Sequence, residues 1–185
     1  MRREMAVNGL SIKRLYTKAE MVDVARLFAR RCAAGQAWEW DGVRFEFLHP
    51  AAGAQYRRND GSCVLRVEAG GGAVLFTGDI ERAAERDLIS FNSKNLKADV
   101  LLVPHHGSRT SSTAPFIAAV SPRWAVVTAG YRNRFGHPHP EVLERYRAAG
   151  AIVSRTDLDG AVTVVLENEV RLASERARRG RYWLQ

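Results

Sequence analysis

The amino-acid sequence predicts an α/β layered domain, because short apolar runs typical of buried strands alternate with segments of helical spacing. The chain has 185 residues, of which 46% are hydrophobic, which suits one globular domain and excludes an intrinsically disordered protein. No stretch approaches the roughly 18 apolar residues of a membrane-spanning helix, and residues 1–20 lack the apolar core of a secretory signal. We therefore expect a soluble chain without a signal peptide.

The N-terminal segment, residues 1–30, differs in pattern from the rest of the chain. Thr17 and Glu20 match a capping box, and the apolar residues after them recur on one helical face. This pattern predicts an amphipathic helix over residues 19–31.

Strands and helices alternate along the remaining chain. Residues 43–47 alternate apolar and charged side chains, which predicts a half-buried strand that ends before Pro50. Residues 62–69 and 73–77 flank a three-glycine turn, which predicts a hairpin. Shorter apolar runs and helical spacing predict strands over 99–103, 124–128, 151–154, 161–166 and 170–173, and helices over 80–88, 115–120 and 140–149.

Charge and cysteine content limit the partners and the compartment. With 28 Lys and Arg against 20 Asp and Glu, the net charge of +8 favours an anionic partner, with nucleic acid as one candidate. Residues 174–185 form a basic tail that we expect to be a solvated end. Cys32 and Cys63 are too few for a disulfide framework and lack metal-site spacing, so Cys63 is expected to be a small core residue.

Polar side chains follow three predicted buried strands at the point where each strand ends. These side chains are Asp79, the adjacent His105 and His106, and His137 in a proline-flanked loop. Loops at one end of a layered sheet often build sites, so we expect the four side chains to converge. Carboxylate oxygen and imidazole nitrogen suit Zn²⁺ or Mn²⁺, and such ions promote hydrolysis. The alternative for Asp79 is that it caps the helix after it.

Two further polar residues have structural alternatives. Ser108 lies two residues from His106, a candidate base, but no acid that would orient this base is evident. Phosphate anchoring or local turn bonding therefore competes with a nucleophilic role for Ser108. His139 is expected to begin the next helix rather than to bind an ion.

Twelve short segments, in a fixed order from residue 32 to residue 183, resemble the C-terminal metallo-β-lactamase-type domain of ComEC-type DNA-internalisation competence proteins. They are Cys32-Ala33-Ala34-Gly35-Gln36, Trp40-Asp41-Gly42-Val43, Leu48-His49-Pro50, Asn59-Asp60, Ser62-Cys63-Val64-Leu65, Thr77-Gly78-Asp79-Ile80-Glu81, Pro104-His105-His106-Gly107-Ser108, Ser111-Ser112, Gly136-His137-Pro138, Arg155-Thr156-Asp157, Gly160-Ala161 and Arg181-Tyr182-Trp183.

The resemblance implies a four-layer αββα sandwich with a divalent metal, Zn or Mn, at one edge of its sheets. It implies that Asp79 bridges two metals and that His137 binds the second, and we add His105 as a metal ligand. The expected roles of the other site residues are catalysis for His106 and Ser108, and substrate binding for Asn59, Ser62 and Arg109.

The sequence departs from the family in one respect. The His-x-His-x-Asp-His segment of the fold is absent, since no histidine precedes His49. We therefore expect residues 31–173 to be the C-terminal part of the domain, truncated at its N-terminal side. The resemblance implies a larger bacterial protein, with this domain attached to the inner membrane on its periplasmic or extracellular side. The expected partners are DNA, the remainder of the membrane channel protein, and a second copy of the chain through an exposed sheet face.

Three functions remain open from the sequence. The first, implied by the resemblance, is metal-dependent hydrolysis of phosphodiester bonds in the DNA strand that is not transported. The second is a catalytically weak or inactive DNA-binding fragment, because half of the family's metal ligands are missing. The third is a hydrolase of a small phosphodiester or an acyl compound, against which the Pro-His-His-Gly-Ser segment argues.

Overall fold

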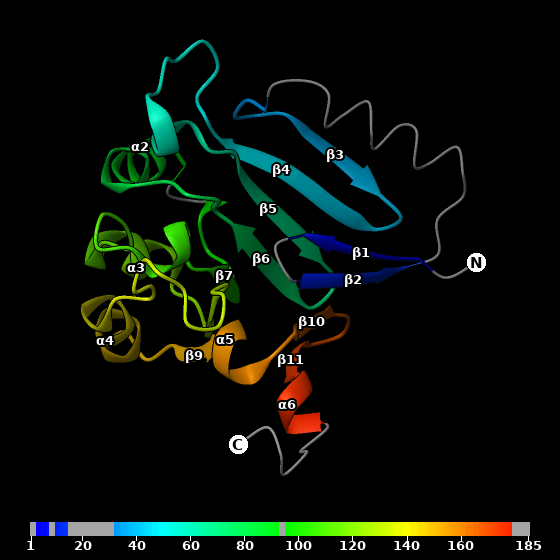
Figure 1. The fold of residues 1–185 in the computed structure, drawn as a ribbon. Coiled ribbons are helices and arrows are strands. Elements are labelled where there is room, and N and C mark those ends of the chain that lie inside the picture. The colour runs from blue at the N-terminus through cyan, green and yellow to red at the C-terminus, as the bar shows by residue number, and fades with distance from the viewer. Residues whose placement is uncertain (1–2, 8–9, 15–31, 93–94, 179–185) are drawn as a thin grey trace.

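Two β-sheets and a layer of helices make up the domain in the computed structural model (Figure 1), which describes residues 3–7, 10–14, 32–92 and 95–178. The larger sheet has seven strands in the order β3-β4-β5-β6-β7-β8-β9, and the smaller has four in the order β1-β2-β10-β11. The strands of the larger sheet are β3 (Ala37–Trp40), β4 (Val43–His49), β5 (Val64–Ala69), β6 (Gly72–Phe76), β7 (Val100–Leu102), β8 (Trp124–Val127) and β9 (Ile152–Arg155). The smaller sheet contains β1 (Arg3–Val7), β2 (Leu10–Arg14), β10 (Val162–Leu166) and β11 (Val170–Ser174).

Strand direction changes halfway across the larger sheet. Strands β3 to β6 pair antiparallel, whereas β6, β7, β8 and β9 pair parallel. The carboxyl ends of β4, β6, β7 and β8 therefore meet at the same edge as the beginning of β5. This edge carries the residues expected to perform chemistry.

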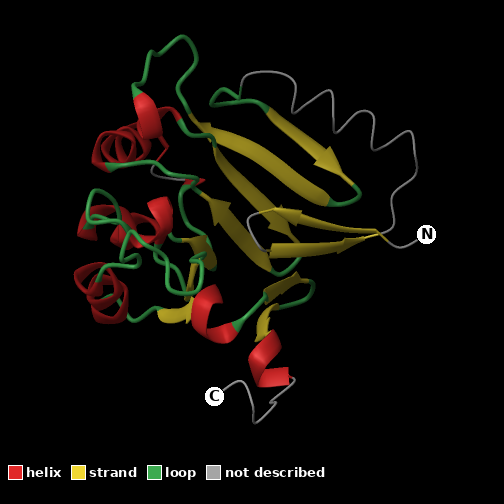
Figure 2. Cartoon of the chain, in the orientation of Figure 1, coloured by secondary structure: helices red, strands yellow, loops and turns green. Residues whose placement is uncertain are grey.

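Three helices cover one face of the larger sheet (Figure 2): α2 (Arg82–Asn92), α3 (Ala114–Val120) and α4 (Pro140–Ala148). Their buried side chains pack on one side of the strands, in a core that includes Leu75, Leu101, Phe116, Leu88 and Tyr146. Shorter helical segments are η1 (Arg58–Gly61), η3 (Pro104–Gly107), α5 (Thr156–Asp159) and α6 (Glu175–Arg178). None of the helices in the described ranges has the length and apolar character needed to cross a bilayer.

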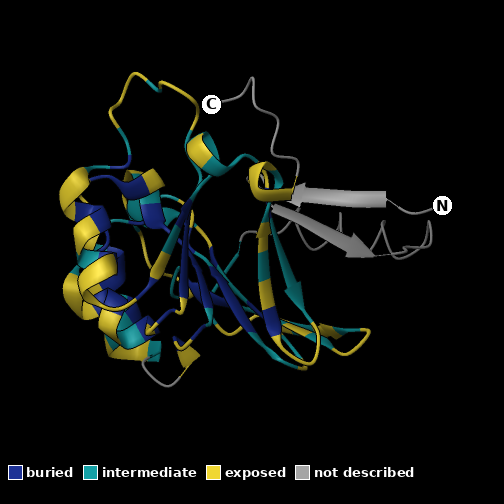
Figure 3. Ribbon diagram, turned by 90° about the horizontal axis from the view of Figure 1, so that it is seen from below, coloured by how far each residue is buried: buried dark blue, intermediate teal, exposed yellow. Residues whose placement is uncertain are grey.

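A second core lies between the two sheets. Alternate residues of a strand face opposite sides, so Val74 and Val100 point away from the helices and pack with Val162 and Val170 of the smaller sheet. Figure 3 shows the buried residues concentrated along the strands of the larger sheet, with the exposed helix surfaces outside them. Helices, larger sheet and smaller sheet thus form three successive layers, and the predicted α/β layered class is confirmed. The helix predicted over 19–31 lies outside the described residues.

Most predicted elements from residue 43 onward are present within one to three residues of their expected ends. Seven elements of the described ranges were not predicted, namely β1, β2, β3, η1, η3, α5 and α6. Strands β1 and β2 form an antiparallel hairpin within the segment assigned to residues 1–30, and β2 pairs parallel with β10. Part of that N-terminal segment therefore belongs to the smaller sheet, whereas the division of the chain at residues 30 and 173 stays a prediction.

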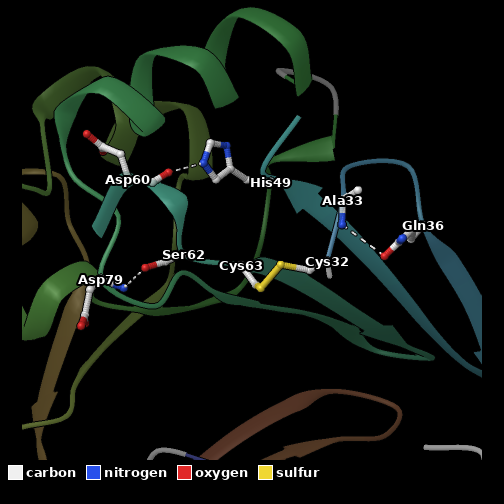
Figure 4. Close-up of a disulfide and its surroundings, with 8 residues drawn as sticks. All are labelled: Cys32, Ala33, Gln36, His49, Asp60, Ser62, Cys63 and Asp79. Carbon is white, nitrogen blue, oxygen red and sulfur yellow. Dashed lines mark hydrogen bonds between the residues drawn. A yellow bond between two sulfur atoms is a disulfide. The ribbon is translucent and has the colours of Figure 1, made fainter. Parts of the chain in front are cut away.

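The assignment of Cys63 as a small core residue was wrong. Cys63 forms a disulfide with Cys32, across a sequence separation of 31 residues (Figure 4). The two residues flank strands β3 and β4, whose antiparallel hairpin returns the chain to the start of β5. The number and spacing of the cysteines do not predict that Cys32 and Cys63 lie close together, because their proximity arises only from the pairing of the strands.

Candidate functional site

The candidate site lies at the edge of the larger sheet where β6, β7 and β8 end. Thr77 follows β6 and is fully buried, and its hydroxyl donates to the Leu102 carbonyl of β7 at 2.8 Å. This bond fixes the chain directly before Gly78 and Asp79. The backbone N–H of His105 then donates to the Gly78 carbonyl at 3.0 Å, which places the two strand ends side by side.

Both histidines after β7 adopt the left-handed backbone conformation. His105 has φ 49° and ψ 40°, and His106 has φ 55° and ψ 20°. Such a conformation costs a residue other than glycine on the order of 1–3 kcal/mol, so the surrounding contacts must hold the turn. Among these contacts, the Ser111 hydroxyl donates to the Pro104 carbonyl at 3.0 Å. The turn directs the two adjacent imidazoles to different surroundings.

Gly107 allows the loop after β8 to approach the histidine turn closely. It has φ +82°, and an added Cβ would lie 2.6 Å from Cβ of Pro138. The backbone N–H of His139 donates to the Gly107 carbonyl at 2.9 Å, which holds the two loops together. His137 consequently lies beside His105, with 5.9 Å between ring centroids. The predicted approach of these two histidines is therefore present.

Asp79 is paired with His106. The Nδ1–H of His106 donates to the Thr128 carbonyl at 2.7 Å, because a carbonyl oxygen only accepts, and in the neutral imidazole the lone pair is then on Nε2. This Nε2 lies 3.6 Å from Oδ1 of Asp79. Two acceptors that face each other in this way favour a proton or a metal cation between them. Two ligands of one tetrahedral zinc ion are ~3.4 Å apart, close to the separation seen here.

His105 has partners at both ring nitrogens. Nδ1 lies 3.3 Å from Oε1 of Glu81 and 3.3 Å from Oγ1 of Thr110, and the Asn59 side-chain amide lies 3.4 Å from Nε2. The Thr110 hydroxyl also donates to Glu81 at 3.0 Å. His105 as a metal ligand stays a prediction, and it would require the Asn59 amide to move away.

Ser62, two residues before β5, holds the backbone of Asp79. Its hydroxyl accepts from the Asp79 N–H at 3.3 Å (Figure 4). Asp60, two residues before Ser62, accepts from the backbone N–H groups of Glu81 and Ala84 at 2.9 and 3.1 Å. Asp60 thus accepts from one N–H in the first turn of α2 and from the N–H just before the helix, and the Arg82 N–H donates to the Thr110 carbonyl at 3.1 Å. The side chain that caps α2 is therefore Asp60, and the capping alternative for Asp79 was wrong. The substrate-binding roles predicted for Asn59 and Ser62 remain untested.

The remaining predicted residues lie nearby in different surroundings. The Ser108 hydroxyl bonds to Thr110, at 3.1 Å from its Oγ1 and 3.4 Å from its N–H. This is the local turn bonding that competed with a nucleophilic role. Arg109 is exposed and lies 3.7 Å from Glu141. His139 accepts from the Glu141 N–H at the start of α4, as expected of a helix-start residue.

The electrostatics of the cluster favour neutral imidazole at His137. Burial lowers the pKa of His137 most, and the nearby His105, His106 and His139 lower this pKa further. A neutral imidazole presents a lone pair at neutral pH, which is the form that binds a metal or accepts a proton.

The donor set fits a metal ion only in part. Asp79 and His106 have a suitable separation, and His137 is available as a neutral imidazole. Within the described part of the chain, however, no group of three or more His, Cys, Asp or Glu side chains is arranged to hold a metal ion. The described residues therefore do not form a complete metal centre.

Family comparison agrees with this architecture. Residues 10–131 match the family model of the metallo-β-lactamase superfamily, and this chain belongs to that superfamily. The match begins within β2 and extends into the loop that precedes His137. Metallo-β-lactamase proteins usually bind divalent metals, although the described residues contain no complete ligand group.

Individual relatives include proteins named for competence. The chain is 49% identical over 134 residues to "Competence protein ComA" of Neisseria gonorrhoeae, covering 72% of the chain and 19% of that protein. It is 36% identical over 136 residues to "ComE operon protein 3" of Bacillus subtilis, covering 74% and 17%. With "Recombination protein 2" of Haemophilus influenzae, identity is 33% over 173 residues, covering 91% and 21%. The resemblance to competence proteins is confirmed, and the chain spans about a fifth of these relatives' length.

Proposed function

We propose that this chain takes part in DNA uptake and contributes to hydrolysis of DNA phosphodiester bonds at Asp79, His105, His106 and His137, which we call the Asp79–histidine cluster. The observation that carries the proposal is the 3.6 Å pair of Asp79 and His106, at the sheet edge that also holds His105 and His137 at 5.9 Å. Membership of a metal-binding hydrolytic fold, relatives named for competence, and the net charge of +8 support DNA as the substrate.

The metal ion would need ligands beyond those that the described residues supply. A centre with two or three ligands has an incomplete coordination sphere and binds weakly. We expect calorimetric titration of the chain with Mn²⁺ or Zn²⁺ to give weak binding without a sharp stoichiometric endpoint. Tight one-to-one binding that His137→Ala abolishes would show that the ligand set is complete within this chain, and would contradict this part of the proposal.

Hydrolysis is tested with an end-labelled oligonucleotide over a wide range of Mn²⁺ concentration. We expect slow cleavage that requires the metal and is lost in Asp79→Asn. Glu144→Gln is the matched control, because it removes the same kind of charge from a carboxylate that is 72% exposed on α4 and pairs with Arg147. Equal cleavage by Asp79→Asn and the unchanged chain would overturn the assignment of the cluster.

The second candidate function is DNA binding without catalysis. It is favoured by the lack of a complete metal-ligand group among the described residues. Its phosphate contacts would come from surface arginines, namely Arg57, Arg58, Arg109, Arg132, Arg134 and the basic tail. Binding of this kind weakens steeply as salt rises and needs no divalent metal. DNA binding with no cleavage at any metal concentration would therefore select this candidate.

The disulfide supports the periplasmic or extracellular location expected for the domain, because disulfides persist mainly in oxidising compartments. The partners that we propose are DNA, the remainder of a membrane channel protein, and a second copy of this chain bound through a sheet face. Sedimentation that shows monomer alone at all concentrations would contradict the second copy.

A further inference from the structure

The loop between β8 and His137 exposes two aromatic side chains that belong to neither hydrophobic core. Tyr131 is 70% exposed and Phe135 is 68% exposed. Burying such a side chain is worth about 1.5–3 kcal/mol, so leaving two of them in water forgoes appreciable stability. Two exposed rings within five residues of one loop therefore indicate a binding role.

Each of these rings makes a cation–π contact with an arginine next to it in the sequence. The guanidinium carbon of Arg132 lies 5.2 Å from the Tyr131 ring centroid, and that of Arg134 lies 4.9 Å from the Phe135 centroid. Cation–π contact orients each guanidinium beside its ring, while the ring stays two-thirds exposed. The loop thus presents flat apolar surfaces and positive charge together.

Asn133 holds this loop in shape. Its side-chain amide donates to the carbonyls of Gly130 and His137 at 3.3 and 2.5 Å, and its side-chain oxygen accepts from the His137 N–H at 3.1 Å. These bonds connect the beginning of the loop to its end. Because the backbone of the loop is held by these bonds, a ligand that binds to it loses little free energy in ordering the loop.

The loop that carries Tyr131 and Phe135 contacts the candidate site through Phe135. The Phe135 ring is nearly parallel to the His137 ring, with 21° between planes and 6.1 Å between centroids. His137 in turn lies 5.9 Å from His105. A ligand stacked on Phe135 would therefore lie beside His137, which in turn contacts His105.

Aromatic rings paired with guanidinium groups suit one ligand chemistry in particular, unpaired nucleobases linked by phosphates. Bases stack on aromatic rings regardless of sequence, and arginine contacts the phosphates between them. A duplex hides its base faces in its own stack, so such a loop discriminates between single and double strands. We propose that residues 130–136 form a stacking site for single-stranded DNA beside the cluster. This inference rests on the proposed function for its substrate class.

Binding is measured by fluorescence anisotropy with labelled DNA and a chelator, so that no hydrolysis occurs. The ligands are a single strand, its duplex, and an abasic strand of equal length that keeps the phosphates and lacks the bases. We expect Tyr131→Ala and Phe135→Ala each to weaken single-strand binding about five- to hundredfold, with little effect on the abasic strand. Phe135→Trp keeps an aromatic ring and should bind the single strand as well as the unchanged chain does.

Phe91→Ala is the matched control, because Phe91 is 75% exposed on α2 and is absent from the loop. Unchanged single-strand affinity in both loop variants, or an equal loss for the abasic strand, would overturn the proposal. Binding of the same proteins to anionic lipid vesicles is measured as well. If Tyr131→Ala and Phe135→Ala lost vesicle binding but kept single-strand DNA binding, the loop would contact a membrane, and the proposal would be overturned. Binding is measured without metal, and cleavage is measured in the separate assay with Mn²⁺, so the two proposals can fail independently. Ring-dependent binding with no cleavage would contradict only the proposed function, and cleavage with no ring-dependent binding would contradict only this inference.

Discussion

The disulfide between Cys32 and Cys63 ends one residue from Ser62, whose hydroxyl accepts the backbone N–H of Asp79 at 3.3 Å. The covalent link therefore anchors the start of β5 at the point where this strand supports the candidate site. Figure 4 shows the disulfide and the Ser62–Asp79 bond on the same short segment. Removing the link affects both the stability of the domain and the support of Asp79.

Reduction of the disulfide should lower the free energy of unfolding by about 3–4 kcal/mol, because the link closes a loop of 31 residues. The measurement is urea unfolding with and without a reductant. The double variant Cys32→Ser, Cys63→Ser should unfold like the reduced chain and be insensitive to the reductant. Identical unfolding of the unchanged chain under both conditions would contradict the prediction.

Gly107→Ala should destabilise the domain and displace His137. The substitution combines φ +82° with a Cβ 2.6 Å from Pro138, so we expect a cost of about 2–4 kcal/mol. Gly150→Ala is the control, because Gly150 has φ +81° but nothing within 4 Å of the added Cβ, and it should cost about 1 kcal/mol. The NMR signals of the His137 ring should move in the first variant only. Equal effects of the two variants would show that the Pro138 contact is unimportant.

Asp60→Ala should cost about 0.5–2 kcal/mol, since it removes the acceptor for the Glu81 and Ala84 N–H groups at the start of α2. Asp60→Asn retains a side-chain oxygen and should recover most of the loss. Thermal unfolding of the three proteins gives the comparison. An Asn variant as unstable as the Ala variant would show that the negative charge, not the capping oxygen, is what α2 requires.

The sequence predicts the strands that carry the site residues better than it predicts which distant residues pair with one another. The runs that form β6, β7 and β8 are short, continuous and apolar, as strands buried on both faces must be, so the positions of Asp79 and the histidines at the strand ends could be predicted. The hairpin of β1 and β2 escaped prediction because Arg3–Val7 and Leu10–Arg14 are brief and rich in charge.

Pairings between distant residues could not be predicted from local pattern. The Cys32–Cys63 bond depends on how β3, β4 and β5 pair, and the cap of α2 comes from Asp60, more than twenty residues before the helix. The pairing of Asp79 with His106 depends on the left-handed turn at His105 and His106, which no spacing rule specifies.

The His137 imidazole should titrate below its ordinary pKa of 6.5 in the metal-free protein, because burial and neighbouring histidines disfavour its protonated form. A lowered pKa in the folded state means that the unfolded chain binds this proton more tightly. As pH falls below about 6.5, His137 should therefore reduce the stability of the unchanged chain relative to His137→Gln.

The His137 pKa is measured by NMR titration of its ring protons. His105→Gln should raise this pKa toward 6.5, because His105 contributes more to the lowering than the other two histidines. His139→Gln should raise it less, since His139 contributes least of the three. A midpoint above 6.5 in the unchanged protein would instead mean that the Asp79 carboxylate, 3.6 Å from His106, governs the charge of the whole cluster.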